Sequence, residues 1–156
     1  MSKFQCSNDN GELHLLFRSG HYNCKFINSF VDLKSLELTC SVVITEKDKL
    51  PRSLTILSVG CKNVNVSNLC NLKQLTISNC SNISDNHLRQ IPDLESLKVN
   101  ALYPLITGMG LLEFYALKSL HISLTNVDFG PVIYRLVKLE KLFIWTTWWY
   151  KTICDN

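Results

Sequence analysis

The sequence lacks the features that mark membrane-spanning, secreted and nucleic-acid-binding proteins. No apolar stretch reaches the roughly 18 residues that a transmembrane helix needs, and the N-terminal residues contain no apolar segment of the kind found in a secretory signal. The 16 lysines and arginines are scattered without a basic run, and the net charge is only +3. We therefore expect a cytoplasmic protein that binds neither a membrane nor nucleic acid.

Sequence motifs of the common catalytic and cofactor sites are also missing. Gly108-x-Gly110 is not followed by the Lys-Ser/Thr pair of a phosphate-binding loop, and neither a nucleophile elbow nor a His-Glu-x-x-His motif occurs. His21 and Cys24 have the spacing of metal ligands, but the chain offers no second half for such a site. We therefore predict no enzyme activity, no cofactor and no metal site.

Cysteine is not scarce, but its number is odd. The seven cysteines are Cys6, Cys24, Cys40, Cys61, Cys70, Cys80 and Cys154. In a cytoplasmic protein we expect them to be reduced thiols and small buried hydrophobes. Cys40, Cys61 and Cys80 follow neighbouring predicted strands, where caps of backbone groups inside the core are favoured over a metal or redox cluster.

The sequence does contain a repeated pattern of leucines. Leu-x-x-Leu-x-Leu, with Ile or Val accepted at the last position, begins six times, 21, 18, 22, 23 and 22 residues apart. The six copies are Leu33-Leu36-Leu38, Leu54-Leu57-Val59, Leu72-Leu75-Ile77, Leu94-Leu97-Val99, Leu117-Leu120-Ile122 and Leu139-Leu142-Ile144. Each Leu-x-Leu is expected to form a short strand with an apolar inner side, which only stacking in parallel can bury.

A period of roughly 20–29 residues with this pattern is typical of leucine-rich repeats. The sequence therefore predicts an α/β leucine-rich repeat solenoid of six to seven repeats. Its curved parallel sheet would form the concave face, and short helices, 3₁₀ turns and loops would form the convex face. The segment Ser84–Pro92 is expected to be a short capped helix, and Gly130-Pro131 to open another. The second unit, residues 54–71, is too short for a helix and is expected to return in an extended or 3₁₀ conformation.

The two ends depart from the pattern. Residues 1–32 are predicted to form an N-terminal cap with a degenerate first repeat, in which Leu13 and Leu15 fill the second and third apolar positions and Asn10 replaces the first. Residues 33–145 hold the six repeats, and residues 146–156 are predicted to form an aromatic C-terminal cap or tail.

The third unit carries a more specific pattern than the other units, Leu72-x-x-Leu75-x-Ile77-x-x-Cys80-x-x-Ile83-Ser-Asp85-x-x-Leu88. It resembles the cysteine-containing class of leucine-rich repeats that is common in F-box-type substrate receptors. In the next unit, Ile106-Thr107 corresponds to the first two residues of the Ile83-Ser84-Asp85 segment. The resemblance implies the repeat fold and a binding role without a catalytic residue. It also implies an alternative function, as an adaptor or substrate-receptor subunit of a ubiquitin ligase.

The residues between the apolar positions are predicted to form rows on the concave sheet. One row is expected to run His14, Glu37, Ser58, Thr76, Lys98, His121 and Phe143, and the row after the third apolar position to include Ser78, Asn100, Ser123 and Trp145. The main hypothesis is a non-catalytic scaffold that presents this sheet and its loops to an unidentified protein partner. A merely solvated sheet is the competing interpretation. The candidate partner-binding residues are Glu37, Ser58, Thr76, Ser78, Lys98, Asn100, His121, Phe143, Trp145, Trp148 and Trp149.

The C-terminal end is rich in aromatic residues, since Phe143, Trp145, Trp148, Trp149 and Tyr150 lie within eight residues. They would form either a cap over the last repeat or an exposed patch for a partner or for self-association. Residues 143–145 would also form a terminal edge strand, which invites pairing with another copy. A homodimer through this end, in a structural self-associating protein, is therefore a further alternative.

Overall fold

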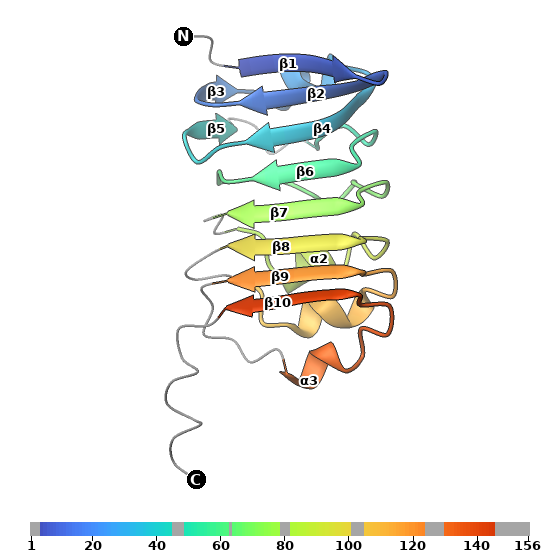
Figure 1. The fold of residues 1–156 in the computed structure, drawn as a ribbon. Coiled ribbons are helices and arrows are strands. Elements are labelled where there is room, and N and C mark those ends of the chain that lie inside the picture. The colour runs from blue at the N-terminus through green and yellow to red at the C-terminus, as the bar shows by residue number, and fades with distance from the viewer. Residues whose placement is uncertain are drawn as a thin grey trace.

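The computed structural model describes residues 4–44, 49–62, 64–78, 82–100, 105–123 and 130–145. Its main element is an eight-stranded sheet whose strands follow one another in chain order (Figure 1). The strands are β1 (Phe4–Asp9), β2 (Glu12–Phe17), β4 (Leu33–Leu38), β6 (Ile56–Val59), β7 (Gln74–Ser78), β8 (Ser96–Asn100), β9 (Ser119–Ser123) and β10 (Lys141–Trp145). All neighbours pair in parallel except β1 and β2, which are antiparallel. The fold is thus α/β, with a large, mostly parallel sheet.

The repeated leucines determine the register of this sheet. The second apolar positions pair across all neighbouring strands from β4 to β10, and so do the third. From β4 to β9 these residues are at most 1 % exposed. The predicted strands, their parallel pairing and their inner apolar side are therefore confirmed for these units.

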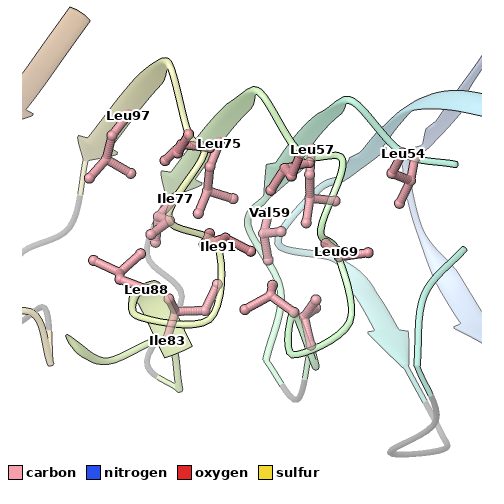
Figure 2. Close-up of a cluster of buried hydrophobic side chains, with 14 of the residues drawn as sticks. Leu54, Leu57, Val59, Leu69, Leu75, Ile77, Ile83, Leu88, Ile91 and Leu97 are labelled. Atoms are coloured by element: carbon pink, nitrogen blue, oxygen red, sulfur yellow. The ribbon is translucent and has the colours of Figure 1, made fainter. Parts of the chain in front are cut away.

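The described segments that connect the strands lie on one side of the sheet (Figure 1). They include α1 (Cys24–Asn28), a two-stranded sheet of β3 (Gly20–Tyr22) and β5 (Val42–Ile44), α2 (Asp85–Leu88), the 3₁₀ helix η1 (Met109–Glu113) and α3 (Gly130–Ile133). Figure 2 shows Ile83, Leu88 and Ile91 on the inner side of the sheet near Ile77. All of them are at most 1 % exposed, so the connecting segments close the core against the strands.

The predicted connecting helices are confirmed. Ser84 is the N-cap residue of α2, where its main-chain N–H donates to Nδ1 of His87 at 3.3 Å, and the helix ends before Pro92. α3 begins at Gly130 as expected and buries Val132. Between β6 and β7, the described residues 60–62 and 64–73 contain no helix, in agreement with the extended return expected for the shortest unit.

Asparagine side chains connect one return segment to the next. The amide group of Asn28 donates to the carbonyl of Lys49, about one unit later in the chain, at 3.1 Å. The amide groups of Asn68, Asn71 and Asn82 donate to the carbonyls of Leu50, Arg52 and Val64, about one unit earlier, at 2.7, 2.9 and 3.0 Å. These carbonyls lie in irregular segments, where no helix or strand supplies a donor. The amides therefore satisfy main-chain acceptors that stacking would otherwise desolvate.

The structure of the first unit differs from the sequence prediction. Asn10 is not a degraded leucine position but, with Gly11, forms the two-residue turn that joins β1 to β2; both have positive φ, 54° and 81°. In the sheet, Leu15 pairs with Leu36 and Phe17 with Leu38. The degenerate repeat therefore lies two residues later than predicted, because the turn and a register shift between Leu13 and His14 displace it.

An aromatic cluster closes the N-terminal end of the core. Phe17 is fully buried, stacks on Phe4 at 5.6 Å and meets Tyr22 edge-to-face at 4.5 Å between ring centroids. Phe26 of α1 contacts all three of these rings. The antiparallel β1 and this cluster together cover the first parallel strand.

The expectation of buried cysteines is only partly right. Cys24 and Cys61 are buried, whereas Cys6, Cys40 and Cys70 are exposed, and Cys80 and Cys154 lie outside the described residues. Cys40 remains outside because the chain turns after β4, where the amide of Val42 donates to the carbonyl of Thr39, and Val42 enters the core instead.

Candidate functional site

The face of the sheet opposite the connecting segments carries three rows of outward-pointing side chains, and we call it the open face. One row runs Leu16, Glu37, Ser58, Thr76, Lys98, His121 and Phe143; the second runs His14, Ser35, Ile56, Gln74, Ser96, Ser119 and Lys141; the third includes Ser78, Asn100, Ser123 and Trp145. Nine of the eleven candidate residues therefore lie together on this face. Trp148 and Trp149 lie outside the described residues.

The position of His14 differs from the sequence prediction. It pairs with Ser35 and not with Glu37, so Leu16 takes the predicted place of His14 in the first row. His14 and His121 therefore do not share a row. The cause is the same register displacement that moves the degenerate repeat.

The N-terminal part of the open face contains a shallow depression that the sequence prediction missed. Its volume is about 600 Å³, and it is lined by Phe4, Gln5, Cys6, Ser7, His14, Leu15, Leu16, Ser35 and Glu37. Four of these residues come from β1, which the repeat pattern does not include. The Asn10-Gly11 pair was the signal that could have revealed this strand, because Asn-Gly favours a two-residue hairpin turn.

The middle of the open face is made of small polar residues. Ser58, Thr76 and Ser78 are half-buried, and the hydroxyl of Ser123 donates to the side-chain oxygen of Asn100 at 2.6 Å. Short side chains leave the main chain of the strands close to the surface. A flat or extended partner could therefore approach the middle of the sheet without displacing long side chains.

The C-terminal part of the open face combines aromatic and basic groups. The rings of His121 and Phe143 stack at 4.3 Å between centroids with an interplanar angle of 19°. Phe143 is nevertheless 47 % exposed and Trp145 63 % exposed. Lys98 and Lys141 flank these rings, and no aspartate or glutamate lies in the described rows over β7 to β10.

The surroundings of His121 favour the neutral form of its ring. Burial, and secondarily the positive charge of Lys98, lower its pKa below the usual value of 6.5. A carboxylate arriving near Lys98 would oppose the second of these effects. The histidine can therefore report on the charge of whatever binds beside it.

The inner side of β10 differs from that of the other strands. Leu142 is 48 % exposed, whereas Leu120, which occupies the same position in β9, is 1 % exposed. Ile144 is half-buried, whereas Ile122 is 1 % exposed. The described core is therefore open at its C-terminal end.

Charged side chains at the beginning of the strands form a ladder beside the open face. Glu95 lies 2.7 Å from Lys118 and 3.7 Å from Lys73. The hydrogen bond and charge of Lys118, with a smaller effect of Lys73, lower the pKa of Glu95 below its usual value. These side chains are exposed, so the ladder contributes little to stability and mainly aligns neighbouring units.

Among the described residues, no group of three histidine, cysteine, aspartate or glutamate side chains is placed to hold a metal ion. No helix in the described part of the chain is long and apolar enough to cross a membrane. No protein-family model, no curated protein and no solved structure matches the chain.

Proposed function

We propose that this chain is a leucine-rich repeat module that binds a protein partner through the open face of its sheet and does not catalyse a reaction. The observation that carries the proposal is the contrast between the two sides of the strands. The inner leucines from β4 to β9 are at most 1 % exposed, while exposed aromatic and basic residues are gathered on the outer side. Exposed aromatic clusters of this kind are enriched in the centres of protein interfaces.

The geometry supports binding because the strands hold their side chains rigidly. Parallel neighbours lie about 4.8 Å apart, so each row presents its groups at a regular spacing. Phe143 is further restrained by the ring of His121. Rigid anchors lose little conformational entropy when a partner binds, which favours affinity.

The positive charge of this surface indicates which chemical groups its partner would carry. Lys98 and Lys141 lie beside Phe143 and Trp145, and carboxylates are absent from the described rows over β7 to β10. A partner with acidic groups next to an apolar side chain would complement this region. Glu37, in the N-terminal depression, would face a different part of the same partner.

Site-specific photo-crosslinking in cells tests the proposal. A photoreactive amino acid at Ser96, on the open face, should capture a defined protein, whereas the same amino acid at Asn86, exposed on α2, should not. Recovery of Skp-like and cullin proteins would instead favour the ubiquitin-ligase alternative. Equal capture from both positions would contradict binding through the open face.

Binding of the purified partner gives the quantitative test. Lys98→Glu and Trp145→Ala should each weaken the affinity at least tenfold if they remove an interface anchor. Lys25→Glu, an exposed charge reversal on α1, is the matched control and should leave the affinity unchanged. An affinity that survives both open-face substitutions would rule out the proposed surface.

A further inference from the structure

In the described part of the chain, β10 is the last strand of the sheet, and its inner side is only partly covered. Leu142 is 48 % exposed and Ile144 is half-buried, although their counterparts in β9 are fully buried. The opposite end of the same sheet is finished differently. There β1 covers β2, and Leu15 and Phe17 are only 2 % and 0 % exposed.

The main-chain hydrogen bonds of β10 indicate which of its N–H and C=O groups point away from β9. The amide of Lys141 donates to the carbonyl of Lys118 at 2.9 Å. Alternate residues of a strand direct their main-chain groups to opposite neighbours, so Lys141, Phe143 and Trp145 bond toward β9. The N–H and C=O groups of Leu142 and Ile144 therefore point to the free edge, and no described strand pairs with them.

We propose that β10 pairs antiparallel with β10 of a second copy of this chain, with the twofold axis at Phe143. This register places Leu142 opposite Ile144 of the other copy. Both residues direct their main-chain groups toward this edge, so two such pairs use all four donors and all four acceptors of the two edges. Antiparallel registers centred on Leu142 or Ile144 would use only part of them.

The side chains are self-complementary in the same register. On the inner side, Leu142 and Ile144 of one copy extend the apolar core of the other. On the outer side, Lys141 lies opposite Trp145 of the second copy, which is a favourable cation–π arrangement. Phe143 faces its own counterpart as a pair without direct main-chain bonds, at about 4.5 Å between Cα atoms.

A second copy fits better than an unrelated strand because a twofold interface uses the same patch on both sides, and here each group meets its complement. The contact is small, since each copy contributes one five-residue strand. Interfaces below about 1,200 Å² are weak and transient, so we expect dissociation in the micromolar range. The inference uses the edge of the sheet and does not depend on a protein partner at the open face.

Disulfide trapping tests the register. The background would be a chain with serine at the exposed or undescribed cysteines, namely Cys6, Cys40, Cys70, Cys80 and Cys154. In this background, Phe143→Cys should form a disulfide-linked dimer rapidly under mild oxidation, because the expected Cα separation suits a disulfide. Ser58→Cys, in the same row but four strands away from the edge, is the control and should remain monomeric. Failure of Phe143→Cys to link, or equal linking by Ser58→Cys, would overturn the proposal.

A charge exchange tests the same pairing without a covalent bond. In sedimentation equilibrium, the wild-type chain should change from monomer to dimer over the micromolar range. Trp145→Lys should weaken association at least tenfold, because it brings lysines together across the axis. Adding Lys141→Glu to that variant should restore association, because it places opposite charges at the paired positions. A monomeric wild type, or a double variant no better than the single one, would contradict the register.

Amide hydrogen exchange distinguishes an edge that is covered by a second copy from an edge that is covered within a single chain. The amides of Leu142 and Ile144 should exchange rapidly in dilute solution and become protected at high concentration. The amide of Lys141, already bonded to β9, should be protected at both. Protection of Leu142 and Ile144 that does not depend on concentration would overturn the proposal.

Discussion

Leu97 and Leu142 occupy the same position of the repeating pattern but differ strongly in burial. Leu97 is 1 % exposed in the centre of the sheet, whereas Leu142 is 48 % exposed at its end. Replacing a fully buried leucine by alanine removes its transfer free energy and leaves a cavity, at a total cost of about 3–4 kcal/mol. For Leu142, half of the transfer free energy is already lost and no closed cavity forms, so we expect a cost of about 1 kcal/mol.

Urea denaturation followed by far-ultraviolet circular dichroism measures this difference. With an m-value of about 2 kcal/mol/M, Leu97→Ala should lower the midpoint by about 1.5–2 M and Leu142→Ala by about 0.5 M. The measurement should be made in dilute solution, where association cannot stabilise Leu142. Equal shifts, or a larger one for Leu142→Ala, would refute the conclusion that the core is open at β10.

Three further predictions concern a half-buried histidine, an ion pair and a close packing contact. In nuclear magnetic resonance titration, the pKa of His121 should lie below 6.5, and Lys98→Gln should raise it without restoring 6.5, because burial is the larger cause; an unchanged pKa would contradict the effect of Lys98. Because the hydrogen bond of Glu95 with Lys118 lowers the carboxylate pKa below 4.5, its contribution to stability is present above pH 4.5 and is lost as the pH falls further. Because the pair is exposed, wild type and Glu95→Gln should differ only slightly in melting temperature near pH 7 and should converge well below pH 4.5, and a difference that persists there would refute the assignment. Gly110→Ala should destabilise the protein by about 1–3 kcal/mol in urea denaturation, since its Cβ would lie 2.8 Å from the Cα of the first residue of α2, and an unchanged midpoint would contradict this contact.

The centre of the sheet could be predicted from the sequence because one physical constraint repeats there. Each Leu-x-Leu must bury one side, and only parallel pairing in register does so for all units at once. Leu75, Leu97 and Leu120 therefore lie side by side as the pattern requires. The same alternation places Lys98 and His121 together on the open face.

The ends could not be predicted from the repeat, because local interactions replace it there. At Asn10 and Gly11, the preference for a tight turn determines the chain path, and β1 with its depression follows from that turn. The exposure of Cys40 could not be predicted because its surroundings depend on β5, which no repeat position specifies. The openness of the core at Leu142 depends on what lies beyond the last strand, and a pattern of residues within the strand carries no information about that.

The strands of the main sheet follow one another in chain order, and this order has a consequence for how the protein folds. Each strand pairs only with strands that are close in the sequence, so the entropic cost of closing each new loop stays nearly constant along the chain. In such a chain, formation of the first pair of units is the slow step, and each later unit adds to an existing template. We expect the folding rate to depend on the best-packed central pair and only weakly on the number of units.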